Sequence, residues 1–178
     1  INDKDENVVA GMVVSQNITL LNRVKTELSA IDEELKSNQR LFQAILNTVG
    51  EGILASNTKG DILLSNPAAE KLLGMTLKNK NLSQVAEGIS VRTNAGTAEL
   101  QRDEIPLFMA MSGARVDGYA TEVQHHKTGK IVHLESSARP LLDEGERPDG
   151  AVMIMRDISL RKELEDLLEE HLVALKQK

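Results

Sequence analysis

Residues 51–70 read EGILASNTKGDILLSNPAAE, and this stretch decides how the chain folds. Two short apolar runs, 53–56 and 61–65, flank the turn-forming residues 57–60, in which Gly60 suits a positive φ. This pattern predicts a β-hairpin. Asn66 and Pro67 then favour the N-cap and the first position of a helix, which Gly74 ends. The local unit is therefore a hairpin that runs directly into a short helix.

The residues that follow predict a helical region and then three more strands. Short helices are expected at 82–87 and 103–113, and β-type runs at 114–125, 130–140 and 150–158 are separated by turns. Five strands in antiparallel hairpins, with helices inserted after the second strand, make an α+β domain with a five-stranded antiparallel sheet. One face of that sheet would pack on the inserted helices, and a pocket is expected between them.

Long helices are expected on both sides of this domain. Apolar residues alternately three and four apart predict a helix over 20–47, and closely spaced leucines predict another over 159–178. An a/d heptad with one polar position favours a parallel coiled-coil homodimer, and the alternative is an amphipathic helix packed on its own domain. The expected dimer seam consists of Leu21, Val24, Leu28, Ile31, Leu35, Asn38, Phe42 and Ile45.

Residues 10–19, AGMVVSQNIT, resemble residues 150–159, GAVMIMRDIS. Each copy is a short β-type run that ends in Asn/Asp-Ile-Thr/Ser, and each is followed by a leucine-spaced helix. A repeat of this kind indicates a modular array. The two copies lie a whole number of heptads apart, so the heptad phase of the helix before the domain equals that of the helix after it.

Composition excludes several classes of protein. The chain has 40% hydrophobic and 27% charged residues, which is typical of a globular protein, and its net charge of −6 argues against general nucleic-acid binding. The absence of cysteine removes disulfides, thiolate metal sites and thiol catalysis. No apolar run reaches the roughly 18 residues of a membrane span. We therefore expect no nucleic-acid partner and no direct membrane contact, and an anchor elsewhere in the full-length protein stays open.

Together these motifs resemble a PAS domain of bacterial multidomain sensor proteins of the histidine kinase type. The likeness covers about residues 38–160. It is carried by residues 51–57, 60–70, 73–74, 105–107, 138–140 and 156–159. Asn57 departs from the family pattern, where Asp is common, but should still serve the turn.

The resemblance implies four parts. Residues 1–19 would be the final strand and the Asn-Ile-Thr end of a preceding PAS module, disordered or paired with a neighbouring sheet. Residues 20–47 would be a coiled-coil linker helix, 48–158 the PAS domain and 159–178 an exit signalling helix. Asp157, Ile158 and Ser159 would form the signal-relay motif, in which Asp157 ties the domain to the exit helix, with Arg139 or Lys59 as its expected partner.

The implied function is that of a cytoplasmic, non-catalytic sensory and dimerisation module of a two-component system. It would relay a signal through coiled-coil helices to an output domain, for which a histidine kinase is favoured. Its partners would be a second copy of itself and the neighbouring PAS and output domains. The alternative is a PAS sensor that binds a small molecule and controls a cyclic-dinucleotide enzyme or another output domain.

No catalytic residues, metal site or cofactor are predicted. A flavin adduct needs a cysteine, and haem-binding members use a histidine on the helix before the three strands, which residues 103–113 lack. Adjacent strand residues His125 and His126 point to opposite faces, which argues against one shared metal. A small apolar ligand or a simply packed core remains. The candidate pocket residues are Leu54, Ile62, Leu64, Leu72, Met75, Leu107, Met111, Val123, Leu134, Val152 and Ile154.

Overall fold

The computed structural model describes residues 4–93 and 98–176, with side chains described for 20–93 and 98–172. The chain divides into two compact units, one that ends at Ile45 and one that begins at Leu46. The first unit is helical throughout its described part. It belongs to α1, which spans Lys4–Thr48.

The prediction of a strand within residues 1–19 is wrong. Residues 4–19 are helical and continue without a break into the predicted linker helix, whereas residues 1–3 lie outside the described part. A strand must bond its backbone groups to neighbouring strands, and this segment is not among the six strands of the described sheet. In a helix the same groups bond within the segment, so these residues need no partner strand.

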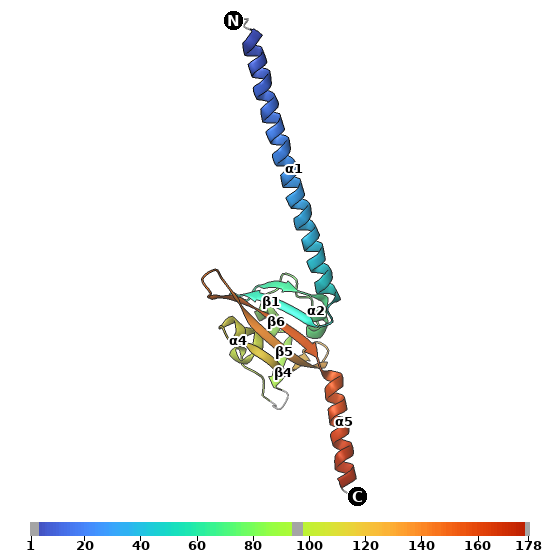
Figure 1. The fold of residues 1–178 in the computed structure, drawn as a ribbon. Helices are drawn as coiled ribbons and strands as arrows, with labels where there is room; N and C mark the ends of the chain where they lie inside the picture. The colour runs from blue at the N-terminus through green and yellow to red at the C-terminus, as the bar shows by residue number, and fades with distance from the viewer. Residues whose placement is uncertain (1–3, 94–97, 177–178) are drawn as a thin grey trace. The chain divides into compact units, whose positions relative to one another are not determined.

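The second unit is built on one antiparallel sheet (Figure 1). Its strand order is β2-β1-β6-β5-β4-β3, and every neighbouring pair is antiparallel. The strands are β1 Gly52–Asn57, β2 Ile62–Ser65, β3 Ile89–Thr93, β4 Val116–His125, β5 Ile131–Leu142 and β6 Pro148–Asp157. The sheet thus has six strands and not the predicted five. The missed strand, β3, is an edge strand of five residues, and the alternation of apolar and polar residues in ISVRT extends over too few positions to stand out.

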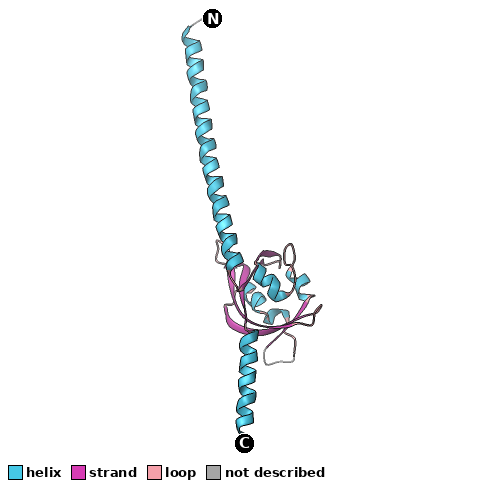
Figure 2. Cartoon of the chain, turned by 90° about the vertical axis from the view of Figure 1, so that its right-hand side faces the viewer, coloured by secondary structure: helices cyan, strands magenta, loops and turns pink. Residues whose placement is uncertain are grey.

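Short helices lie together on one side of the curved sheet (Figure 2). They are α2 Pro67–Leu73, α3 Leu82–Ala86, the 3-10 turn η1 Arg102–Glu104 and α4 Pro106–Met111. The single helix predicted at 103–113 is divided at Ile105. This residue precedes a proline and adopts an extended conformation, with φ −77° and ψ 131°, because the proline ring disfavours helical geometry before it.

The predicted turn and caps around the hairpin are confirmed. Gly60 has φ 85°, and Gly74 has φ 67° at the end of α2. Asn66 accepts a hydrogen bond from the Ala69 N–H and so caps α2. These positions fix where β2 ends and where α2 turns back over the sheet.

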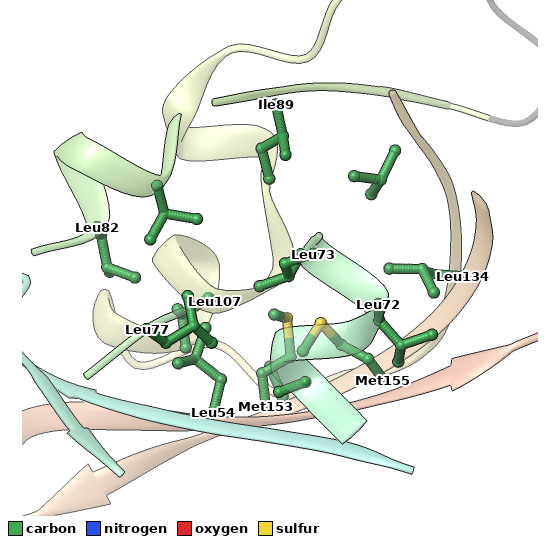
Figure 3. Packing of buried hydrophobic residues seen from close by; sticks show 14 of the residues in the cluster. Leu54, Leu72, Leu73, Leu77, Leu82, Ile89, Leu107, Leu134, Met153 and Met155 are labelled. Atoms are coloured by element: carbon green, nitrogen blue, oxygen red, sulfur yellow. The ribbon is translucent and has the colours of Figure 1, made fainter. Parts of the chain in front are cut away.

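The hydrophobic core lies between the inner face of the sheet and the short helices. In Figure 3, Leu54 and Met153 from the sheet gather with Leu73 and Leu107 from the helices. The last helix of this unit is α5, Ser159–Lys176. Within the described residues, no helix combines the length and apolar character needed to cross a bilayer.

Candidate functional site

A cavity of about 330 Å³ opens within the core. Its floor is the inner face of the central strands, and its other walls come from α2, α3, β3 and the segment from Glu99 to Phe108. Four of the residues predicted from the sequence line it: Leu54, Leu107, Val123 and Leu134. We refer to this space as the central cavity.

The prediction of which β6 side chains face the pocket is wrong by one residue. Ile154 is 42% exposed and Val152 is half-buried, so both lie on the outer face, whereas Met153 and Met155 are buried and line the central cavity. Side chains alternate between the faces of a strand, so an error of one residue exchanges the two faces. The run Val-Met-Ile-Met is apolar on both faces and offers no alternation by which to choose.

The other predicted lining residues lie elsewhere in the domain. Leu72 is buried in the core beside the cavity, Ile62, Met75 and Met111 pack at the margin of the core, and Leu64 is half-buried on β2. None of these lines the central cavity as described. The sequence did not predict that Ile89 and Val91 line the cavity. Both belong to β3, and a prediction of that strand would have included them.

The polar residues of the central cavity divide into two groups. Thr121 and Ser136 lie on the inner sheet face and are each only 3% exposed. Ser83, Glu99 and Arg102 line the cavity but are exposed, so they stand at its opening. The guanidinium carbon of Arg102 lies 4.4 Å from the centre of the Phe108 ring. Charge is thus confined to the opening, and the buried wall carries hydroxyl groups only.

The adjacent histidines hold the fold together through their ring nitrogens. His125 is buried, and its Nε2 lies 2.8 Å from the Leu72 carbonyl oxygen. His126 bonds through Nδ1 to the Glu87 carbonyl and through Nε2 to the Ser90 hydroxyl, at 2.9 and 2.8 Å. Among the described residues, no group of three His, Cys, Asp or Glu side chains could hold a metal ion.

The predicted relay motif fastens the start of α5 to β5. The Asp157 carboxylate accepts a hydrogen bond from the Ser159 N–H at 2.9 Å. The Ser159 hydroxyl accepts one from the His133 N–H, and the Ile158 N–H donates to the His133 carbonyl. Ile158 itself is buried.

The partner expected for Asp157 is corrected by these contacts. The Arg139 guanidinium instead donates to the Val116 carbonyl at 2.7 Å and pairs with Asp117. The Asp157 carboxylate acts locally at the first turn of α5, so neither Arg139 nor Lys59 is needed to hold the motif.

The connection into the sheet is fastened by Asn66, which is 2% exposed. Its amide Nδ2 donates to the carbonyls of Leu46 and Glu51, at 3.1 and 2.9 Å. Its Oδ1 accepts from the N–H groups of Ile53 and Ala69, at 2.8 and 2.9 Å. One side chain therefore joins the last turn of α1, the start of β1 and the start of α2.

An ion pair joins the start of β1 to the end of β6. The Arg156 guanidinium donates to the Glu51 carboxylate at 2.6 Å, and this contact raises the pKa of Arg156 above its usual value. β1 and β6 are hydrogen-bonded neighbours, and Gly52 pairs with Met155. The two ends of the domain that lead to α1 and α5 thus lie at the same end of two adjacent strands.

The predicted dimer seam is exposed along α1. Its seven apolar side chains, from Leu21 to Ile45, are between 52% and 68% exposed, and Asn38 is exposed as well. The stripe therefore has the spacing of a coiled coil and apolar surface available for a partner helix.

The model of the PAS fold family matches residues 40–158. The chain belongs to the PAS family. PAS domains are sensory, non-catalytic modules, and the PAS resemblance of the sequence is confirmed. No curated protein matches the sequence.

Several solved structures with a similar fold are described as PAS domains. The PAS domain of an HTR-like protein from Haloarcula marismortui has a TM-score of 0.52 at 16% identity, over 73% of this chain and 99% of that one. The PAS domain of BvgS from Bordetella pertussis has a TM-score of 0.50 at 18% identity, over 78% and 98%. The PAS domain of nitrogen regulation protein NR(II) from Vibrio parahaemolyticus is 24% identical, over 66% and 98%, with a TM-score of 0.47.

Proposed function

We propose that this PAS domain works as a parallel homodimer that relays a signal between its flanking helices to an output domain of the histidine kinase type, in the cytoplasm. The observation that carries the proposal is the exposed seam on α1. Burial of an aliphatic side chain stabilises by about 1.5–3 kcal/mol, so seven half-exposed side chains hold enough driving force for association. The kinase output rests on the resemblance of the sequence to sensor kinase PAS domains.

Charges beside the seam support close approach of two helices. Glu27 and Asp32 occupy positions next to the heptad core, where two like charges would repel a second copy. Each pairs with a base on its own helix, Glu27 with Arg23 and Asp32 with Lys36. These pairs offset the charge at these two flanking positions and reduce repulsion between two copies there.

The exit helix can continue the same seam. Leu164 and Leu168 occupy the same heptad positions in α5 as Val24 and Leu28 occupy in α1. They are 52% and 64% exposed. The relay motif bonds the first turn of α5 to β5, so a shift of the sheet would be transmitted to that helix. A rotation or register shift in one pair of helices could thus reach the other.

Cysteine cross-linking tests this proposal cleanly because the chain has no native cysteine. Leu28→Cys lies in the seam, and Glu33→Cys on the opposite face of the same helix is the matched control. Under mild oxidation we expect Leu28→Cys to form a disulfide-linked dimer much faster than Glu33→Cys. Equal rates for the two variants would contradict a dimer through this seam.

Phase transmission needs its own test in the full-length protein. One residue inserted after Ser159 rotates all later positions of α5 by about 100° about the helix axis. We expect the output activity or its response to change, and seven inserted residues, which preserve the phase, should restore it. An unchanged response to the single insertion would contradict relay through helix phase.

The second candidate function is that of a sensor for a small molecule, controlling a cyclic-dinucleotide enzyme or another output domain. The central cavity of about 330 Å³ favours it, because protein interiors are normally packed without such voids. Native mass spectrometry of freshly purified protein is the test. A retained adduct that raises the melting temperature when added back supports ligand sensing, and a bare mass with no such adduct opposes it.

A further inference from the structure

Two hydroxyl groups on the inner face of the sheet line the central cavity and make no hydrogen bond to another described residue. Thr121 on β4 and Ser136 on β5 lie on the inner face of adjacent strands, since Thr121 pairs with Leu134, two residues before Ser136. No hydrogen bond is found for either hydroxyl in the part of the chain that the structure describes, and the one fully buried side-chain polar atom there that lacks a partner is Arg92 Nε, so both hydroxyls are accessible from the cavity. Hydroxyl groups on a largely buried wall usually find a hydrogen-bond partner, so these two are placed to bond to a molecule in the cavity.

The rest of the buried wall is apolar. Around the two hydroxyls stand Val123, Leu134 and Met155, and across the cavity stands Leu107. The charged residues among the described lining, Glu99 and Arg102, are exposed at the opening. A charged group carried to the hydroxyls would lose its hydration without a buried counter-charge, so the group they meet must be uncharged.

The volume limits the size of the occupant. An apolar cavity of about 150 Å³ holds a benzene molecule, so about 330 Å³ corresponds to roughly a dozen non-hydrogen atoms. This is far smaller than a haem or a flavin nucleotide.

We propose that the central cavity binds an uncharged amphipathic molecule of this size, with an aliphatic body and one hydroxyl or carbonyl oxygen that hydrogen-bonds to Thr121 and Ser136. The aliphatic body lies against Leu107, Val123, Leu134 and Met155. This inference deepens the ligand-sensing candidate above and rests on it. It assigns specificity to two strand positions that the sequence pattern alone did not single out.

The test is a titration with three probes that share one nine-carbon chain: 1-nonanol, nonanoate and nonylammonium. Calorimetry gives each affinity, and amide chemical shifts of β4 and β5 locate the bound probe. We expect 1-nonanol to bind in the cavity at least tenfold more tightly than either charged probe. Equal or tighter binding of nonanoate would overturn the inference. The head group would then be bound by a charged residue at the opening of the cavity and not by the two hydroxyls.

Variants of the two hydroxyls test the polar assignment. Thr121→Val and Ser136→Ala keep the shape of the wall and remove one hydroxyl each. We expect each to weaken 1-nonanol binding about fivefold, the effect of one neutral hydrogen bond. Ser137→Ala is the control, because Ser137 is next in sequence but lies on the outer face and bonds to the Gly118 N–H.

The outcomes separate this inference from ligand sensing itself. Unchanged affinity in both hydroxyl variants, with 1-nonanol still in the cavity, overturns the polar assignment and leaves a ligand site in place. Absence of 1-nonanol binding overturns the proposed ligand class, and native mass spectrometry then decides ligand sensing independently. Loss of affinity in both variants but not in Ser137→Ala supports the inference.

Discussion

Asn66 should be the single polar residue on which the domain depends most. The variant Asn66→Ala removes four side-chain hydrogen bonds, two donated to the carbonyls of Leu46 and Glu51 and two accepted from the N–H groups of Ile53 and Ala69. No residue other than asparagine or glutamine can donate and accept two bonds each in this way, and glutamine is one methylene longer.

The cost follows from these bonds. Loss of the N-cap of α2 costs about 1 kcal/mol. The Leu46 carbonyl, the Glu51 carbonyl and the Ile53 N–H also lose their partners, at about 1 kcal/mol each. Water can reach the two carbonyls, which belong to half-buried residues, so their contribution to the loss of stability is smaller. We expect Asn66→Ala to reduce the free energy of unfolding by about 3 kcal/mol, or by roughly 10 °C in melting temperature for a domain of this size.

Urea unfolding followed by circular dichroism measures this change, with the exposed Asn47→Ala in α1 as the control. Asn66→Asp refines the test. It keeps both accepted bonds but places a carboxylate against two carbonyls, so its loss of stability should be smaller at acidic pH, where the protonated side chain can donate. A cost below about 1 kcal/mol for Asn66→Ala would refute the reasoning.

Three further predictions concern the sheet, the hairpin turn and the exit helix. Met155→Ala should cost about 2–5 kcal/mol in urea unfolding, whereas the outward-facing Ile154→Ala should cost under about 1 kcal/mol, and the reverse order would show that the parity of β6 is misassigned. Hydrogen bonds, chiefly from Asn57 and secondly from Asn81, hold the pKa of Asp61 below its usual value, so this carboxylate contributes stability above its unfolded pKa that is lost as the pH falls through the folded pKa. Asn57→Asp removes one donor and adds a like charge, so its deficit in urea unfolding should be largest at neutral pH and shrink below about pH 4; a deficit independent of pH would contradict this account. Asp157→Ala removes the acceptor of the first amide of α5, so hydrogen exchange should quicken in that turn but not in β5, and unchanged exchange would mean that the carboxylate does not hold the helix.

Sequence reasoning succeeded where local chemistry dictates structure. The hairpin of 51–70, the glycine turns and the Asn66 cap could be predicted because each depends on a few neighbouring residues. It failed where tertiary context decides. The strand expected near the start of the chain needs partner strands, and β3 is held by its pairing with β4 more than by its own pattern.

The candidate site shows the same division. Val123 could be placed in the cavity because the second half of β4 alternates between buried and half-buried residues, and Leu54 because β1 is a short apolar strand that is buried along most of its length. Met153 and Met155 could not, because β6 is apolar on both faces. Thr121 and Ser136 were missed because a polar residue within a strand normally predicts the outer face, and only the pairing register shows that these two face inward.

The mass of the chain in solution tests the central claim, association through the α1 seam, most directly. Light scattering at tens of micromolar should give twice the 19.5 kDa of one chain. In isolated coiled coils, leucine at a with isoleucine at d favours more than two strands, so the measured mass also separates the proposed dimer from a tetramer. Leu28→Glu with Leu35→Glu should return the protein to the monomer mass with the domain still folded. A monomeric mass for the unaltered chain, or a dimer that survives both substitutions, would contradict association through this seam.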